Sequence, residues 1–521
     1  MLTLMDWFAG AGGSSQGADA VPGVTVALAA NHWNLALDTH ATNFPNTTHK
    51  QGDIRDADVH NWPVAELHWA SPECTKWSLA RGKKRNFTNT KQGALFDVAK
   101  TPQQLADELV EERSRALMSQ VPDYLEGVIS RGRLVLAGVV ENVIDERAWD
   151  GFDDWLARFH RMGYKTRVIA LNSMHAAGIR TLRAPQSRDR LYVGYWHTSL
   201  GRHPDWDKWL RPRAFCPGCD EIVPALQVFK NPRNDMGRYR SQYLYRCPRS
   251  TCRNEMVEPA VLPALAAIDL GLPTRKVGDG RPGKTFQPYA PATVARIKTG
   301  MARYWAPLLT PTGGTWRTEA TPLSDPMPTR TTRENDAVAL PPLIVPTEGR
   351  DGKYATPASD PGRTQTTRRE TGVAFPPPFI IPMRGGGDKE QARPIDAPLH
   401  TVTAGGNHHG LITPEPLLVP YYTNGTAKPA YQPVGALTTK DRYGLATTDL
   451  PAIDVNEVGF RMLEPREIAR GMAFGAAYTV LGSKRDQVTQ LGNAVTPPVA
   501  ELLISALVET ITGTDLEPAR C

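Results

Sequence analysis

Residues 1–200 alternate short apolar runs with segments long enough to form helices. The runs are LTLMDWF, GVTVALAA, ELHWAS, LVLAGVVENV, YKTRVIAL and RLYVGYW, in that order. Strands separated by helix-length segments form βαβ units, so this part of the chain predicts a largely parallel sheet. The full length of 521 residues exceeds what one ordinary domain needs, and we expect two or three domains.

Composition narrows the class of protein. Apolar residues make up 40% and charged residues 22%, as in a chain that mostly folds, and the net charge of +6 suits a polyanionic partner. No apolar run approaches the length of a membrane span, and the N-terminus has no signal-peptide pattern. Six cysteines in a chain of this length do not form a disulfide scaffold. We expect a cytoplasmic monomer without membrane contact, associated with the nucleoid if its source is a prokaryote or a phage.

The region from about 210 to 455 is rich in Pro, Gly, Thr and Arg and repeats itself. PLSDPMPTRTTRENDAVALPPLIVP (322–346) is echoed at 357–382, more loosely at 394–420, and as a fragment at 433–447. The spacing of roughly 35 residues is typical of stacked structural units. One interpretation is a structural stack of β-hairpins. Another is a surface that presents Arg, Thr and His to a phosphate backbone, and the two are compatible.

A glycine-rich turn follows the first apolar run, in DWFAGAGGSSQG (6–17). Glycines let the backbone turn tightly and approach a ligand, although such a turn also occurs without one. NHW (31–33) ends the second run and GDI (52–54) the third. Because ligands bind at the carboxyl ends of strands in open sheets, Phe8, Trp33 and Asp53 are predicted to meet around one adenosine. Core packing or helix capping is the alternative for each residue alone.

Four further motifs complete an ordered set with this turn. The turn contributes Asp6, Phe8, Gly10, Gly12 and Gly13; the others are Pro72 and Cys74; Glu141, Asn142 and Val143; Gln186, Arg188 and Arg190; and Gln490, Gly492, Asn493 and Val495. Over roughly 1–200 and 455–510 the chain thereby resembles the cytosine-5 DNA methyltransferases. The resemblance implies an α/β fold: a Rossmann-like catalytic domain that depends on S-adenosylmethionine (SAM), plus a β-rich target-recognition domain.

The resemblance also assigns roles to these residues. Cys74 would attack carbon 6 of cytosine as a thiolate, so that carbon 5 can accept a methyl group. Glu141 would act as an acid at N3, and Arg188 and Arg190 would orient the base, its phosphate and the carboxylate. Because the reacting atoms lie inside a stacked duplex, the target nucleotide must be flipped out.

The implied ligand contacts fall into two groups. SAM would be held by Phe8, Ala9, Gly10, Gly12, Gly13, His32, Trp33, Asp53, Ile54, Pro72, Asn493 and Val495. DNA would be contacted by Gln186 and by Arg81, Lys83, Lys84 and Arg85 of the basic segment 78–93, which is otherwise a solvated loop.

Three positions depart from the family pattern. Glu73 precedes Cys74 where the family usually has a second proline, and a carboxylate close to the thiol would oppose thiolate formation. Since neighbours in an extended segment alternate sides, we expect Glu73 to face away from the thiol. His32 stands where an acid usually holds the cofactor ribose. The lead into the Gln-x-Arg-x-Arg motif, GIRTLRAP (178–185), is longer than usual.

A second cysteine cluster lies outside these motifs. Cys216 and Cys219 are followed, after 27 residues, by Cys247 and Cys252. Two tight pairs of thiolates suit a tetrahedral structural zinc ion, and incidental free cysteines are the alternative. The stretch between them, 230–246, mixes Arg, Lys and Tyr and suits DNA contact.

Together these observations predict a DNA cytosine-5 methyltransferase acting on duplex DNA. The expected segments are a catalytic domain (1–205), a zinc-ribbon insertion (206–258), a target-recognition region with repeats (259–455) and a C-terminal segment that completes the catalytic domain (456–521). The alternatives are an RNA cytosine-5 methyltransferase and a catalytically inactive DNA-binding homologue.

Overall fold

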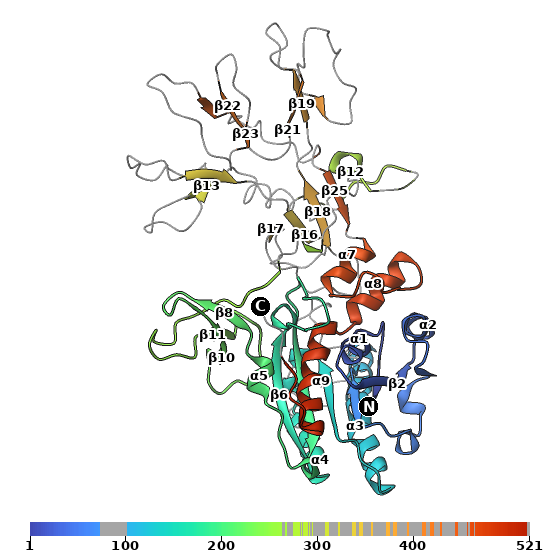
Figure 1. Cartoon of the computed structure of the whole chain (residues 1–521). Helices are drawn as coiled ribbons and strands as arrows, with labels where there is room; N and C mark the ends of the chain where they lie inside the picture. The colour runs from blue at the N-terminus through green and yellow to red at the C-terminus, as the bar shows by residue number, and fades with distance from the viewer. Residues whose placement is uncertain are drawn as a thin grey trace, which may run out of the picture. The chain divides into compact units, whose positions relative to one another are not determined.

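A computed structural model describes residues 1–72, 102–262 and 464–517, together with short strands and isolated residues between 266 and 462 (Figure 1). The chain divides into two compact units. Unit 1 comprises Met1–Ile268, Pro361–Arg369 and Glu464–Cys521, and unit 2 comprises Asp269–Asp360 and Glu370–Leu463. The boundaries of the four predicted segments remain a prediction.

Unit 1 is built on a seven-stranded sheet of order β3-β2-β1-β4-β5-β7-β6. The strands are β1 (Leu2–Trp7), β2 (Val24–Asn31), β3 (Thr48–Gln51), β4 (Leu67–Ala70), β5 (Ala137–Asn142), β6 (Tyr164–Asn172) and β7 (Asp189–His197). The pairs along β3, β2, β1, β4 and β5 are parallel, whereas β7 runs antiparallel to both β5 and β6. The predicted α/β class with a largely parallel sheet is therefore confirmed.

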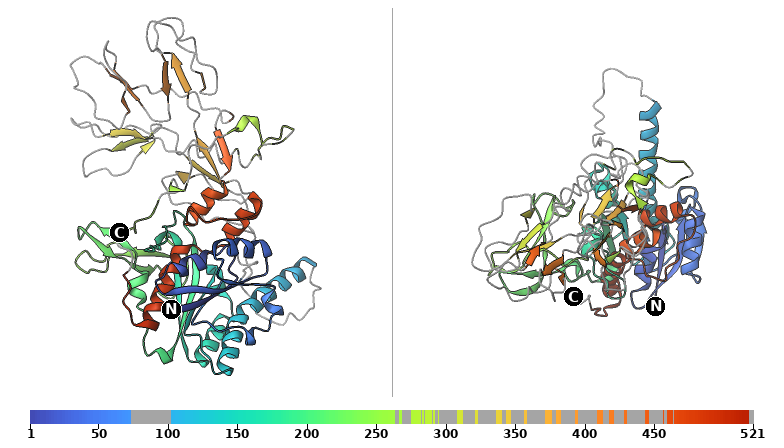
Figure 2. Two further views of the ribbon diagram at one scale, coloured as in Figure 1. Left: turned by 45° about the vertical axis from the view of Figure 1, so that its right-hand side comes forward. Right: turned by 90° about the horizontal axis from the view of Figure 1, so that it is seen from above.

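Helices cover both faces of this sheet. The helices described in unit 1 are α1 (Gly13–Asp19), α2 (Asn34–Asn43), α3 (Pro102–Ser130), α4 (Phe152–Arg161), α5 (Trp206–Leu210), α7 (Pro465–Gly471), α8 (Lys484–Asn493) and α9 (Pro497–Thr512). Short 3-10 turns follow several strands: η1 (Ile54–Asp56), η2 (Val59–Asn61), η4 (Ile144–Ala148), η5 (Ser173–His175) and η6 (Thr198–Leu200). Two turned views show the helices around the sheet (Figure 2).

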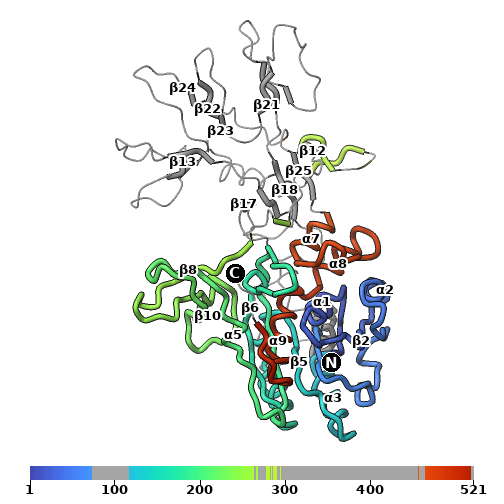
Figure 3. The backbone as a smooth tube through the Cα atoms, in the orientation of Figure 1, coloured from blue at the N-terminus to red at the C-terminus, as the bar shows by residue number. Residues whose placement is uncertain are grey.

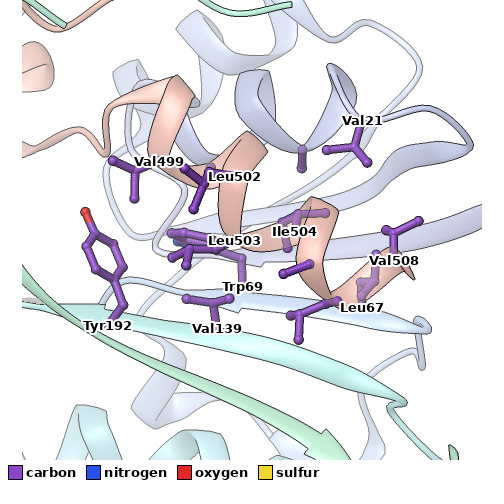
Figure 4. Close-up of a cluster of buried hydrophobic side chains, with 14 of the residues drawn as sticks. Val21, Leu67, Trp69, Val139, Tyr192, Val499, Leu502, Leu503, Ile504 and Val508 are labelled. Carbon is purple, nitrogen blue, oxygen red and sulfur yellow. The ribbon is translucent and has the colours of Figure 1, made fainter. Parts of the chain in front are cut away.

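The two faces of the sheet are apolar because side chains alternate along each strand. Leu4 belongs to the core on the α9 side, and its neighbour Met5 belongs to the core on the α3 side. Figure 4 shows Leu503 and other side chains of α9 above Leu67 and Val139 of the sheet. Each fully buried leucine of this kind contributes about 2 kcal/mol through the removal of apolar surface from water.

α9 packs against α1, so two segments that are far apart in the sequence lie side by side in unit 1 (Figure 3). A Cβ atom on Gly17 of α1 would come within 2.2 Å of the Pro497 carbonyl oxygen at the start of α9. Within the described residues, Lys484–Thr512 is long and apolar enough to cross a membrane, but 89% of its most apolar window is buried. This burial is expected of a core helix.

Residues 213–257 form a small module that we call the ribbon. It pairs β8 (Arg213–Cys216) with β9 (Glu221–Pro224), and β10 (Leu226–Phe229) with β11 (Tyr243–Arg246), both antiparallel. Its core is small and contains Ala214, Cys216, Val223, Ala225, Tyr243, Tyr245, Cys247 and Val257.

The described strands of unit 2 repeat one three-strand pattern four times. In each copy a four-residue strand lies between a two-residue strand and a third strand, with antiparallel pairing. The copies are β13 (Leu308–Pro311) with β14 (Thr321–Pro322) and β15 (Asp336–Ala339); β16 (Leu343–Pro346) with β17 (Thr356–Pro357) and β18 (Thr371–Phe375); β19 (Phe379–Pro382) with β20 (Arg393–Pro394) and β21 (His409–Ile412); and β22 (Leu417–Pro420) with β23 (Lys428–Pro429) and β24 (Tyr443–Leu445). β18 also pairs with β25 (Gly459–Met462), which pairs with β12 (Arg275–Lys276).

This pattern revises the repeat boundaries read from the sequence. The first copy begins at Leu308, before the first predicted repeat at 322, and the predicted fragment at 433–447 supplies the third strand of a fourth copy. The sequence predicts repeats that end in an apolar run, such as LIVP or FIIP. In the structure each of these two runs instead begins a copy and forms its central strand.

Candidate active site

The carboxyl ends of five parallel strands meet at one edge of the unit 1 sheet. β1 lies between β2 and β4, so the chain leaves β1 toward one side and later returns to its other side. Such a reversal of strand order opens a crevice beside the strand ends, where open α/β sheets bind ligands. The described residues of the five motifs lie at this edge or in segments that pack against it.

A pocket with about 380 Å³ of empty space, part of it open to solvent, lies at the ends of β1, β2 and β3. Phe8, Ala30, Asn31, His32, Gly52, Asp53, Ile54, Trp62 and Leu117 line it. The predicted cofactor residues Phe8, His32, Asp53 and Ile54 therefore share one pocket.

Two residues of this pocket were missed by the sequence reading. Trp62 follows η2 and Leu117 comes from α3, so both reach the pocket from outside the family motifs. Trp33, in contrast, does not line this pocket: it stands at the N-cap of α2, where its backbone N–H donates to Asn31 Oδ1 at 2.9 Å. The aromatic walls of the pocket are thus Phe8 and Trp62.

The glycine turn has an unusual backbone at its first residue. Phe8 has φ of 58°, in the left-handed region, and it is followed by Gly10 at 54° and Gly12 at 82°. A bulky side chain rarely adopts this region, which costs about 1–2 kcal/mol, and such strain clusters at functional sites. The turn keeps Phe8 at the pocket wall, while the Ala9 N–H donates to Ala30 O at 3.1 Å.

A buried network of hydrogen bonds fixes the helix start that follows the glycine turn. Ser14 and Ser15 both donate to Asp6 Oδ2 at 2.6 Å, and the Ser15 hydroxyl also lies 2.8 Å from His40 Nε2. Burial raises the pKa of Asp6 to about 6. On the other side, the Tyr478 hydroxyl donates to Ala11 O at 2.5 Å. The start of α1 is therefore held in one place by hydrogen bonds from two parts of the chain.

The predicted catalytic acid and one predicted arginine form an ion pair. Arg190 Nε lies 3.0 Å from Glu141 Oε1, and both side chains are mostly buried. Glu141 is near the end of β5, and Arg190 is the second residue of β7, which runs the opposite way beside it. The antiparallel strand β7 thus brings both charges to the same edge.

Arg188 links this ion pair to the final motif. Its Nη2 donates to the carbonyl oxygens of Gly492 and Ala494, each at 3.2 Å, and its own N–H donates to Asn172 Oδ1 at 2.9 Å. Burial, together with the nearby Arg190 charge, lowers the pKa of Arg188 to about 9, although Glu141 opposes the shift. Arg188 is 3% exposed, so here it holds backbone rather than facing solvent.

The remaining predicted residues are placed as follows. Gly13 lies against the final motif: a Cβ atom on it would come within 1.9 Å of the Val495 carbonyl oxygen. Asn493 is exposed, and Pro72 is buried just beyond β4. Gln186 is 1% exposed, and its amide nitrogen and oxygen have no hydrogen-bond partner in the structure as described.

Six predicted residues lie outside the described residues. They are Glu73, Cys74, Arg81, Lys83, Lys84 and Arg85. The predicted orientation of Glu73 and the nucleophilic role of Cys74 therefore remain predictions.

The family model of the C-5 cytosine-specific DNA methylases matches residues 2–106 and 408–509. These two segments are similar to the corresponding parts of that family. They include the glycine turn, the Pro-x-Cys motif and the final motif.

Several solved methyltransferase structures are similar to this chain at low identity. The Entamoeba histolytica methyltransferase EhMeth is 12% identical, with 98% of each chain covered and a TM-score of 0.43. The S. pombe Dnmt2 methyltransferase is also 12% identical, covers 98% of this chain and 100% of its own, and has a TM-score of 0.45. A mutant of Spodoptera frugiperda DNMT2 is 11% identical, with 98% and 100% covered and a TM-score of 0.42. No curated protein sequence matches the chain.

The fold also brings the four cysteines of the ribbon together. One sulfur from each of Cys216, Cys219, Cys247 and Cys252 lies within 4.8 Å of the others, and Cys219 Sγ is 3.9 Å from Cys247 Sγ. Four sulfurs that each lie about 2.3 Å from one zinc ion are about 3.8 Å apart, because the site is tetrahedral. The cluster therefore fits a four-thiolate metal site.

Proposed function

We propose that this protein transfers a methyl group from SAM to carbon 5 of a flipped-out cytosine in duplex DNA. One observation carries the proposal: the Glu141–Arg190 ion pair lies at the same sheet edge as the pocket of Phe8, His32 and Asp53. An acid paired with an arginine, at the same edge as a pocket of aromatic and polar side chains, suits the methylation of a base.

The pocket residues fit the cofactor. Phe8 and Trp62 offer aromatic faces to an adenine ring, and His32 and Asp53 offer polar groups to ribose hydroxyls. SAM, when bound, supplies an electrophilic methyl group, and its remainder leaves as S-adenosylhomocysteine.

The residues of the chain perform the other steps. Cys74, after losing its proton, adds as a thiolate to carbon 6 of the base while Glu141 delivers a proton to N3. Carbon 5 takes the methyl group, a proton then leaves carbon 5, the sulfur is eliminated, and N3 returns its proton. Arg190 fixes the carboxyl group of Glu141, and Arg188 fixes the backbone of the final motif beside it.

DNA is held, under this proposal, by Arg81, Lys83, Lys84 and Arg85 and by the recognition region 259–455. The repeated units of that region offer a long surface to a duplex site, which favours DNA over RNA. DNA and transfer RNA offered together as substrates distinguish the two: preferential methylation of RNA would contradict this part of the proposal.

The test uses radiolabelled SAM and DNA that contains 5-fluorocytosine. Fluorine cannot leave carbon 5 as a proton does, so a covalent protein–DNA adduct is expected to accumulate. Cys74→Ala is expected to abolish both the adduct and methyl transfer to ordinary DNA. Cys521→Ala, a cysteine without an assigned role, is the matched control and is expected to keep both. Unchanged methyl transfer by Cys74→Ala would refute the covalent mechanism.

We also propose that the four ribbon cysteines bind one structural zinc ion. Four thiolates complete the coordination of the ion and leave no open position for a substrate. Elemental analysis of the purified protein is expected to find about one zinc per chain, and Cys247→Ser is expected to lose it. A wild-type protein without metal would refute this assignment.

A further inference from the structure

The ribbon contacts the sheet edge that holds Glu141, Arg188 and Arg190, which we call the catalytic edge. Asp189 is the first residue of β7 and stands between Arg188 and Arg190. Its Oδ1 accepts a hydrogen bond from the Tyr239 N–H at 3.1 Å and from the Tyr243 hydroxyl at 3.3 Å. Both tyrosines lie in the ribbon, between its two cysteine pairs.

Asp189 depends on these donors. Burial raises its pKa, and the hydrogen bonds from Tyr239, Asn172 and Tyr243 oppose the rise. A carboxylate removed from water is costly unless hydrogen bonds replace the lost water. Two of its donors come from the ribbon, so displacement of the ribbon would leave Asp189 poorly satisfied and free its strand end to move.

A second contact joins the ribbon to the segment that follows Glu141. Arg147 in η4 donates through Nε to Asp235 at 3.0 Å, and Arg238 lies 3.9 Å from Asp145. η4 begins two residues after the end of β5. Each surface ion pair contributes little alone, but together they place the ribbon against both strands of the catalytic pair.

A third contact is aromatic. The buried His175 ring, in the turn after β6, meets Tyr239 and Tyr245 edge-on, with centroids 4.5 and 4.9 Å apart. Tyr245 stands two residues before Cys247 in the chain. Each such aromatic pair contributes about 1 kcal/mol beyond its buried area. The three contacts together lie at the ends of β5 and β6 and at the beginning of β7.

The ribbon cannot hold its shape by its core alone. Two of its eight buried core residues are the cysteines Cys216 and Cys247, and it contains only short strands. Modules with so small a core need a metal or disulfides to fold, and the binding free energy of a structural metal is then folding free energy.

We infer that the four-cysteine ribbon braces the catalytic edge, with Asp189 as the positioning residue that connects them. Metal binding fixes the ribbon tyrosines, these hold Asp189, and Asp189 sets the positions of Arg188 and Arg190 on either side of it. The cofactor pocket lies on the other half of the sheet, at β1–β3, and is independent of this brace. The inference rests on the proposed function for its effect on catalysis, but the physical coupling does not require turnover.

The test measures amide hydrogen exchange of the full-length protein before and after metal removal with a strong chelator. Exchange of residues 186–192 is expected to rise about tenfold after chelation, because the ribbon no longer holds Asp189, while residues 24–31 of β2 stay unchanged. Asp189→Ala, which removes the acceptor of both tyrosine hydrogen bonds, is expected to show the same local rise while its metal stays bound. Asp220→Asn, in the ribbon but outside these contacts, is the matched control and is expected to behave as wild type.

Binding and kinetics supply the second readout. SAM affinity, measured by calorimetry, is expected to stay within about twofold in Asp189→Ala, whereas kcat for methyl transfer falls about tenfold or more. Unchanged exchange of residues 186–192 in both the chelated protein and Asp189→Ala would overturn the inference, and so would a wild-type ribbon without metal. If exchange is coupled as expected but the wild type methylates no DNA, the brace stands and the proposed function fails.

Discussion

Arg190 Nε lies 3.0 Å from Glu141 Oε1, across the antiparallel junction of β5 and β7. The sheet continues from β5 into a strand of opposite direction, and the beginning of β7 therefore lies beside the end of β5. Because β7 runs antiparallel to β5, a carboxyl group and a guanidinium from distant parts of the sequence form one ion pair. Since the guanidinium is a rigid fork, it fixes the direction of the carboxyl group as well as its charge.

Changes to either member of this pair are expected to suppress methyl transfer. Glu141→Gln removes the transferable proton and should lower kcat about 10²- to 10⁴-fold, the usual contribution of acid catalysis. Arg190→Lys keeps the charge but loses the fork, and a smaller loss is expected. Rates are measured under saturating SAM and DNA. The exposed Arg167→Lys on β6 is the control, and an equal loss in that variant would point to a general defect.

Gly13→Ala is expected to destabilise unit 1. The new Cβ would stand 1.9 Å from the Val495 carbonyl oxygen, so α1 and the final motif would have to separate. The expected loss is about 3 kcal/mol, measured by urea unfolding. Gly471→Ala at the end of α7, where no atom lies within 4 Å of the added carbon, is the control and should leave stability almost unchanged.

Phe8 substitutions separate the role of the ring from the strain of the backbone. Phe8→Ala removes an aromatic wall of the pocket and should weaken SAM binding about tenfold or more. Phe8→Gly also removes the ring but relieves the left-handed φ of 58°, so it should be about 1 kcal/mol more stable than Phe8→Ala. Phe215→Ala, in the ribbon and 52% exposed, is the control for SAM affinity measured by calorimetry.

His68 is expected to make stability depend on pH. Burial lowers its pKa to about 3 in the folded protein, from an ordinary value of 6.5. The unfolded chain therefore binds one more proton than the folded chain between these values. The free energy of unfolding should fall as the pH falls from 6.5 toward 3, by about 1.4 kcal/mol per pH unit from this group.

Substitution of His68 isolates this contribution. His68→Gln keeps a polar partner for the Tyr195 hydroxyl, which lies 2.8 Å from His68 Nδ1. Urea unfolding is measured between pH 6 and pH 4. The free energy of unfolding should change less steeply with pH in this variant, by about 1.4 kcal/mol per pH unit, which corresponds to one proton. The exposed His160→Gln is the control, and an equal change there would argue against the assignment.

Glu501 in α9 is expected to fix the long lead into the Gln-x-Arg-x-Arg motif. Its carboxylate accepts from the backbone N–H groups of residues 179–181 at 2.8–3.0 Å and from the Thr181 hydroxyl at 2.6 Å. Glu501→Ala leaves these donors without their partner and should cost about 3 kcal/mol. Faster amide exchange at residues 179–181 is the direct measurement, and full protection in the variant would contradict the assignment.

The sequence allowed the strands and one half of the candidate site to be predicted. Apolar runs read as strands lie in β1, β2, β4, β5, β6 and β7, because buried strands need continuous apolar residues. Phe8 and Asp53 share a pocket as predicted, because the ends of parallel strands meet at one edge. That argument depends only on strand order and direction, which the alternation of runs and helices indicates.

Long-range contacts without a pattern could not be predicted. Trp62 and Leu117 line the pocket from segments with no motif, and the contact of Asp189 with Tyr239 joins a family motif to an insertion. Trp33 is predicted in the pocket by its position after β2, but in the structure it is the N-cap residue of α2 and does not line the pocket. Periodicity reveals which residues are buried, not which distant partner they meet.

The packing of α9 on α1 has a consequence for synthesis. α1 leaves the ribosome well before α9, and unit 2 is made between them. Throughout that interval, Leu4, Leu67 and Val139 lack the helix that covers them. Domains usually fold in order from the N-terminus during translation, but this catalytic unit cannot finish until its last helix emerges. The nascent chain is therefore expected to need chaperones, and a premature stop before residue 497 should yield no partially active enzyme.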